Sequence, residues 1–132
     1  MNNMIDQLYR DFQLSDGIVL DSRQELKNKI FVAIKGDRFD ANEFASDVIQ
    51  GGARAVIMDN AKLAEKLDGP VYLVENSIQS LQELARFHRK HLRIPVIAIA
   101  GSNGKTTTKE LMHQVLSTRF RVRSTRGNLN NH

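Results

Sequence analysis

The sequence predicts an α/β fold made of a small N-terminal β/α domain followed by the start of a second, parallel-sheet domain. Over residues 1–76, short apolar runs rich in β-branched residues alternate with amphipathic stretches. Over residues 77–132, a long amphipathic stretch leads into an apolar run, a glycine-rich loop and another helical stretch. This second part holds one β-α-β element, whereas a parallel sheet covered by helices normally needs several. We therefore place a domain boundary near Asn76 and expect the chain to be the front part of a larger protein.

The elements of the first part follow from apolar periodicity and from turn residues. Apolar side chains at helical spacing predict a first helix over residues 3–12. Four strands are predicted, at residues 17–20, 29–34, 54–58 and 71–74. Two further helices are predicted, at residues 43–50 and 61–67. Asn42 is suited to cap the first of these two helices, and Gly51 and Gly52 end it.

The second part begins with a long helix. Ser77 is expected to cap this helix, which extends to about Leu92 and places its apolar side chains on one face. Pro95 ends the helix and admits the strand that follows. The remaining predicted elements are a strand at residues 94–100, a helix at residues 106–117 and a strand at residues 119–124. Alternation along the last strand places three arginines on one solvent-facing side, namely Arg119, Arg121 and Arg123.

The segment Gly101-Ser-Asn-Gly-Lys-Thr-Thr-Thr108, between a predicted strand and a predicted helix, has the order that binding a nucleotide polyphosphate requires. Its glycines let backbone N–H groups turn toward an anion, and the helix N-terminus adds partial positive charge. Lys105 adds a full positive charge, and Thr106 offers a hydroxyl to a magnesium ion that bridges the phosphates. The loop is shorter than the common P-loop, because Ile99 stands at the first glycine position. We predict Lys105 and Thr106 as catalytic residues, Thr106 as a metal ligand, and as nucleotide-binding residues Gly101, Ser102, Asn103, Gly104, Lys105, Thr106 and Thr107.

The composition limits the class of protein. With 132 residues, 41% of them hydrophobic, and no cysteine, the chain has material for a packed core and none for a disulfide framework or a thiolate metal site. No apolar run approaches the roughly 20 residues of a membrane span, and the polar N-terminus is no secretory signal. We therefore expect a cytosolic protein. The net charge of +4 suits a phosphorylated small molecule or a nucleic acid as the partner.

Four stretches of this sequence resemble motifs of the Mur ligase family, which builds the peptide of the bacterial cell wall. The glycine-rich loop resembles the family's ATP-binding loop, and Asp21-Ser22-Arg23 resembles an Asp-Ser/Thr-Arg element of its N-terminal domain. Residues 31–40 resemble its Phe-x-Ala-Leu-x-Gly-x-x-x-Asp element. The run Gly127-Asn128-Leu129-Asn130-Asn131 resembles one typical of the member that adds the terminal dipeptide. Two residues depart from the family pattern, since Ala41 stands where glycine is usual and Asn42 where histidine is frequent.

The resemblance implies an ATP-driven amide ligase with a UDP-sugar-binding domain at residues 1–76 and a central P-loop-type ATPase domain that begins at residues 77–132. It implies ATP and Mg²⁺ as cofactors, and UDP-N-acetylmuramoyl-tripeptide and D-alanyl-D-alanine as substrates, in the bacterial cytoplasm. The substrate-binding residues that it implies are Ser22, Arg23, Lys35, Asn128 and Asn131. The acidic magnesium ligand, modified lysine and histidine that the family contributes later are absent from these residues, so this chain alone should be inactive. We expect a monomer that binds no nucleic acid and spans no membrane.

Two alternatives stay open. Another member of the family, or a folylpolyglutamate synthase-like ligase, would share the ATP-binding loop. The run Gly127–Asn131 and the Asp21-Ser22-Arg23 element argue against these relatives. A basic nucleic-acid-binding module is the other alternative, but only Phe120 lies among the C-terminal arginines, whereas single-strand binders stack bases on several aromatic side chains.

Overall fold

The computed structural model describes residues 3–37 and 39–125. It divides the chain into two compact units, Met1–Arg93 and Ile94–His132, each held together by its own contacts. Within the described ranges, no helix is long and apolar enough to cross a lipid bilayer.

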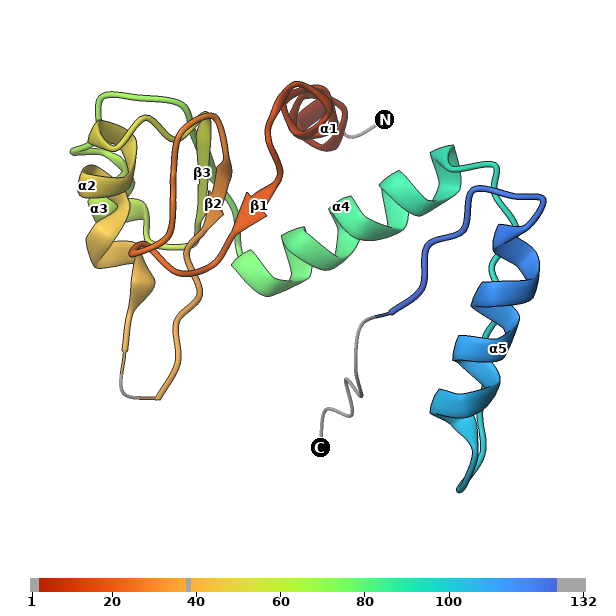
Figure 1. Ribbon diagram of the computed structural model, residues 1–132. Helices are drawn as coiled ribbons and strands as arrows, with labels where there is room; N and C mark the ends of the chain where they lie inside the picture. The colour runs from red at the N-terminus through yellow and green to blue at the C-terminus, as the bar shows by residue number, and fades with distance from the viewer. Residues whose placement is uncertain (1–2, 38, 126–132) are drawn as a thin grey trace. The chain divides into compact units, whose positions relative to one another are not determined.

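The first unit is a four-stranded parallel sheet with helices on both faces (Figure 1). Its strands lie in the order β1-β2-β3-β4, and every neighbouring pair is parallel. The predicted α/β class with parallel strands is therefore confirmed. The elements, in chain order, are α1 (Asn3–Leu14), β1 (Ile18–Val19), β2 (Ile30–Val32), the 3₁₀ helix η1 (Ala41–Phe44), α2 (Ala45–Gln50), β3 (Ala55–Met58), α3 (Ala61–Ala64), β4 (Val71–Leu73) and α4 (Ser77–His91).

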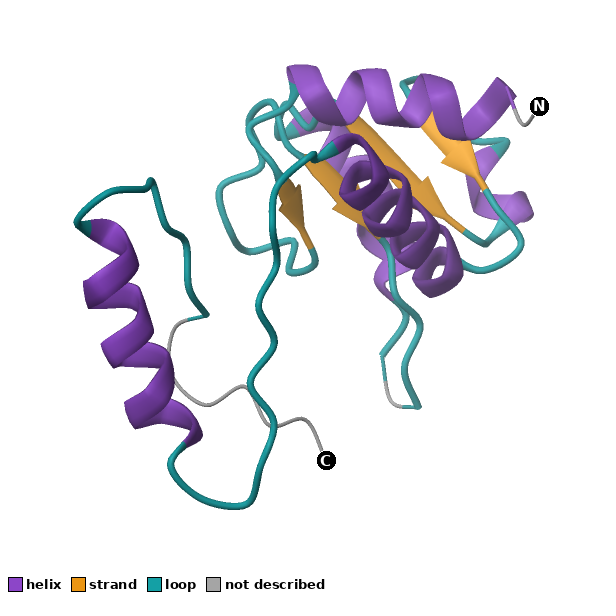
Figure 2. Ribbon diagram, turned by 90° about the vertical axis from the view of Figure 1, so that its right-hand side faces the viewer, coloured by secondary structure: helices purple, strands orange, loops and turns teal. Residues whose placement is uncertain are grey.

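The two central strands are buried on both faces, as expected where helices cover a parallel sheet. Alternate side chains of β2 and β3 therefore point into two different cores. Ile30 and Ile57 belong to the core beneath α1 and α4, together with Leu8 and Leu84. The second core lies beneath α2 and α3, on the opposite face of the sheet (Figure 2), and its buried residues include Phe31, Val48, Val56 and Met58.

A half-buried polar network joins α1 to the sheet on the first of these faces. Asp11 accepts a hydrogen bond from the Tyr72 hydroxyl at 2.5 Å and one from Arg54 Nε at 3.1 Å. Burial of the phenol, with the Asp11 carboxylate beside it, raises the pKa of Tyr72 to about 12. The network therefore keeps the phenol neutral and fixes the start of the chain against β3 and β4.

The predicted domain boundary near Asn76 differs from the observed division after Arg93. The long helix α4 was expected to introduce the second part, but it packs on the sheet of the first unit. Leu84 of α4 is 1% exposed and lies in one core with Leu8 of α1. Its apolar face covers sheet surface that α1 alone leaves open, so hydrophobic burial assigns the helix to the first unit.

The second unit contains the helix α5 (Lys105–Ser117), one residue longer at its start than predicted. The two predicted strands, residues 94–100 and 119–124, are not observed. A strand forms only by pairing with a neighbour, and the described part of this unit provides no second strand for either segment. The apolar side chains of the first segment are accordingly exposed, with Ile94 at 54% and Val96 at 63%.

Two predicted helix caps are also displaced, one by two residues and the other by one. Asp40, and not Asn42, caps the turn that leads into α2, because the Asp40 carboxylate accepts from the Asn42 N–H at 3.0 Å. Asn76, and not Ser77, caps α4 through a bond from the Gln79 N–H at 2.9 Å. Both Asn42 and Ser77 are buried, and Asn42 serves the polar network described below.

Candidate functional site

The glycine-rich loop of the second unit adopts a conformation that depends on its glycines. Gly101 has φ of 150° and Gly104 has φ of 77°, both in the range that side-chain-bearing residues rarely adopt. Gly104 is also the cap of α5, and no side chain occupies the cap position. The first turn of a helix leaves its N–H groups without carbonyl partners inside the helix. The N-terminus of α5, which follows this loop, is therefore sterically open to an anion.

Lys105, the first residue of α5, folds back over this loop. Its Nζ donates a hydrogen bond to the carbonyl oxygen of Gly101 at 2.6 Å and lies 3.4 Å from that of Ser102. The ammonium charge is thereby held beside the N-terminus of α5, where the helix dipole adds partial positive charge. Ser102, Asn103, Thr106 and Thr107 are exposed around it. A polyphosphate would meet a cation, backbone donors and hydroxyls in one place.

A magnesium ion bound with a nucleotide would find one protein oxygen here. Thr106 lies in the first turn of α5, the position from which a hydroxyl ligates magnesium beside bound phosphates. Magnesium commonly takes most of its remaining ligands from phosphates and water, so a single hydroxyl fits this role. No group of three or more histidine or carboxylate side chains that could hold a metal exists among the residues with described positions.

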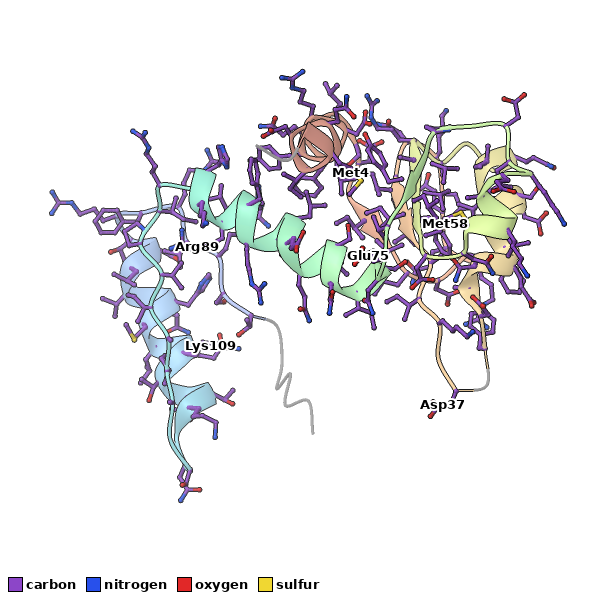
Figure 3. All side chains as sticks on the ribbon, turned by 180° about the vertical axis from the view of Figure 1, so that it is seen from behind. Met4, Asp37, Met58, Glu75, Arg89 and Lys109 are labelled. Atoms are coloured by element: carbon purple, nitrogen blue, oxygen red, sulfur yellow. The ribbon has the colours of Figure 1, made fainter. Side chains whose placement is uncertain are left out.

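A second polar region lies at the carboxyl ends of the strands in the first unit. Because all four strands are parallel, the segments that follow them meet at one edge of the sheet, where open α/β sheets bind ligands. Figure 3 labels Met58 at the end of β3 and Asp37 in the long loop after β2. Between the ends of β2 and β3 lies a cleft of about 230 Å³, lined by Lys35, Asp40, Asn42, Asp59, Asn60, Ala61 and Lys62.

Asn42 is the centre of this cleft's polar network. The residue is 2% exposed, and its Nδ2 donates to Asp40 Oδ1 at 2.7 Å and to Asp59 Oδ1 at 3.0 Å. Its Oδ1 accepts from the Asp59 N–H at 3.3 Å. Asp59 also accepts from the Ser77 N–H at 3.3 Å, which ties the start of α4 to the same group. One amide group thus donates hydrogen bonds to two neighbouring carboxylates.

The predicted substrate-binding residues of the first unit are placed unequally. Lys35 lines the cleft, with Nζ 4.0 Å from Asp40 Oδ2 and a side chain that is 69% exposed. Ser22 and Arg23 follow β1 at the same edge of the sheet but do not line the cleft. Arg23 donates two side-chain hydrogen bonds to the Asp21 carboxylate, at 2.9 and 2.8 Å, and these bonds lower the pKa of Asp21 to about 2.

Asn128 and Asn131 lie outside the described residues. Five polar residues of the cleft were not predicted as site residues, namely Asp40, Asn42, Asp59, Asn60 and Lys62. The available signal was position, since Asp59 and Asn60 directly follow a fully buried strand. Polar side chains at the carboxyl end of a parallel strand are where a ligand is met first.

Comparisons with known proteins agree with the loop and the sheet. Residues 99–132 match the family described as the Mur ligase middle domain. The UDP-N-acetylmuramoyl-tripeptide–D-alanyl-D-alanine ligase of Bacillus subtilis is 39% identical over 88% of this chain, which covers 25% of that protein. The UDP-N-acetylmuramoyl-L-alanyl-D-glutamate–2,6-diaminopimelate ligase of Aquifex aeolicus is 38% identical over 76% of this chain and 20% of its own length.

A solved structure is also similar over nearly the whole chain. The MurF ligase from Thermotoga maritima, in complex with ADP, matches with a TM-score of 0.72 and 31% identity. The match covers 98% of this chain and 28% of that protein. The chain thus spans about a quarter of the length of the relatives that it matches. The sequence motifs, the fold and these matches agree, and over nearly its whole length the chain is similar to the N-terminal part of Mur ligases.

Proposed function

We propose that this chain is part of an ATP-dependent ligase that joins D-alanyl-D-alanine to UDP-N-acetylmuramoyl-tripeptide during synthesis of peptidoglycan precursors. The observation that carries the proposal is the loop before α5, with Gly104 in a left-handed conformation and the Lys105 ammonium held over Gly101. The run Gly127–Asn131 supports this choice of substrate within the family. We further propose that the ligase is a monomer in the bacterial cytoplasm.

In the proposed reaction the residues of this chain bind and orient phosphate. The tripeptide carboxylate attacks the γ-phosphorus of ATP, and ADP leaves with an acyl phosphate formed on the substrate. The dipeptide amine then attacks the acyl carbon, losing a proton as inorganic phosphate departs. The loop N–H groups and Lys105 stabilise the charge on the transferring phosphoryl group. Such positioning and electrostatic stabilisation is the larger part of catalysis in phosphoryl transfer. Magnesium, when bound, supplies further neutralising charge beside Thr106.

The UDP part of the substrate is proposed to bind at the carboxyl edge of the first unit, with contacts from Ser22, Arg23 and Lys35. We expect titration of UDP into this chain to shift amide resonances near these three residues more than those near Lys105. Arg23 has N–H donors beyond the two bonded to Asp21 and would use them on phosphate, so its side-chain resonances should move most. Uridine is the matched control, because it lacks the phosphates and should shift Arg23 little. Shifts confined to the Lys105 loop would contradict a UDP site in this unit.

The choice of substrate is tested in the full-length ligase by release of inorganic phosphate. Release should require both UDP-N-acetylmuramoyl-tripeptide and D-alanyl-D-alanine. An asparagine amide donates and accepts hydrogen bonds without adding charge, so Asn131 suits a sugar or phosphate oxygen. We expect Asn131→Ala to raise the KM for the UDP-tripeptide about tenfold, the loss of roughly one good hydrogen bond, with little change in the KM for ATP.

A second candidate reaction is favoured by the similarity to the ligase that adds 2,6-diaminopimelate. That enzyme's name gives a single amino acid as the added group. Phosphate release with a single amino acid in place of the dipeptide, or with folate and glutamate, would replace the first candidate by one of these relatives. Both outcomes leave the role of the phosphate loop unchanged, because all of these ligases depend on ATP.

A further inference from the structure

Lys109 of α5 makes a contact that the phosphate loop does not explain. Its Nζ donates a hydrogen bond to the backbone carbonyl oxygen of Thr125 at 2.6 Å and lies 3.0 Å from Glu110 Oε1. The Lys109 side chain is only 16% exposed, although the neighbouring Glu110 is 55% exposed. Lysines on a helix surface ordinarily keep the ammonium in water. Here the ammonium is instead directed at the main chain 16 residues further on.

The position of Lys109 relates this contact to the nucleotide site. Lys105 and Lys109 are four residues apart on α5, so they project from the same face one turn apart. Lys105 bonds the carbonyl of Gly101 on the segment before the helix, and Lys109 bonds that of Thr125 on the segment after it. Figure 3 labels Lys109 on the side of α5 along which this second segment returns. The same helix face therefore fixes the chain on both sides of α5.

Thr125 lies two residues before Gly127, the first residue of the run Gly127–Asn131. We propose that Lys109 is a positioning residue of the ligase, which anchors the main chain at Thr125 and so fixes the end of the segment that leads, in sequence, to the run Gly127–Asn131. The exposed Glu110 carboxylate forms an ion pair with the same ammonium, separate from the bond to Thr125. The proposal rests on the proposed function, because the run is useful there only if it binds the substrate whose carboxylate must reach ATP.

The test uses Lys109→Met in the full-length ligase, since methionine keeps an unbranched apolar stem and loses only the ammonium. We expect the KM for UDP-N-acetylmuramoyl-tripeptide to rise about tenfold, as for loss of one charge-assisted hydrogen bond, while the KM for ATP changes less than about twofold. Lys109→Arg retains a donor that can reach the carbonyl and should restore most of the affinity. Glu110→Gln is the matched control, because it removes the neighbouring charge and leaves the Thr125 bond in place.

Two further readouts separate this role from general stability and from the proposed function. Hydrogen exchange should quicken in peptides that contain residues 120–125 of Lys109→Met and stay unchanged over residues 101–108. A wild-type enzyme without dipeptide-dependent phosphate release would overturn the proposed function, whatever Lys109 does. With wild-type activity established, an unchanged KM for the UDP-tripeptide, or an equal rise in both KM values, would overturn the positioning role. An exchange profile that quickens across the whole of α5, or a variant that does not fold, would show a structural role and overturn it too.

Discussion

Replacing Lys105 by alanine should weaken ATP binding by about 100-fold or more, because hydrogen bonds to charged groups contribute roughly 1.5–3 kcal/mol each and more than one phosphate oxygen loses its partner. The ammonium now held 2.6 Å from the Gly101 carbonyl is the full positive charge of the loop. Without it, backbone N–H groups and the helix dipole alone would face the β- and γ-phosphates. Isothermal titration of the proposed full-length ligase with ATP and magnesium measures the change directly.

The control for this variant is Lys66→Ala, which removes one positive charge from an exposed position of the first unit. Its ATP affinity should remain that of the wild type, so a general effect of net charge would be recognised by a loss in both variants. Circular dichroism should show unchanged helix content, since Lys105 is the first residue of α5 and alanine is a good helix former. Unchanged ATP affinity in Lys105→Ala would remove the phosphate-loop assignment.

The parts of the structure that could be predicted from sequence are those fixed by local pattern. The β/α alternation predicted four strands, and each is observed at its predicted place, though shortened at the ends. Glycines before a lysine and three threonines predicted the loop and the helix α5, because glycine adopts the positive φ of Gly101 and Gly104 far more readily than other residues. Both predictions, the strands and the loop with its helix, depend on residues that are close together in the sequence.

The parts that could not be predicted depend on contacts between distant residues. The apolar stripe of α4 has the same pattern whichever unit it covers, and only its packing with Leu8 assigns it to the first. The apolar pattern of residues 94–100 predicts a strand. A strand also needs a neighbouring strand to pair with, and the sequence pattern does not show whether one is present. Asn42 was predicted as a helix cap because asparagine favours that position. Its hydrogen bond with Asp59, 17 residues further on, cannot be predicted from the residues next to it.

Asn42 offers the sharpest test of the cleft, since Asn42→Asp changes no volume and replaces the Nδ2 donor by a carboxylate oxygen. That oxygen would face Asp40 and Asp59 oxygens at the 2.7 and 3.0 Å now spanned by hydrogen bonds. An uncompensated charge at a site 2% exposed should lower the free energy of unfolding by about 3 to 5 kcal/mol at pH 7. Urea unfolding followed by tyrosine fluorescence reports on this unit, because both tyrosines of the sequence, Tyr9 and Tyr72, lie in it.

The pH dependence of this loss separates charge repulsion from a simple packing defect. Crowding of three carboxylates raises the folded-state pKa of at least one of them above its unfolded value of about 4, so the folded variant binds more protons than the unfolded chain between those two values. Stability of Asn42→Asp relative to wild type should therefore fall as the pH rises through that window, and recover at about pH 4 and below. Asn76→Asp is the matched control, because the exposed cap of α4 accepts a carboxylate at a helix N-terminus and should lose no stability. A loss in Asn42→Asp that is equal at pH 4 and pH 7 would mean that the two carboxylates do not meet at Asn42, and the polar lining of the cleft would need a different arrangement.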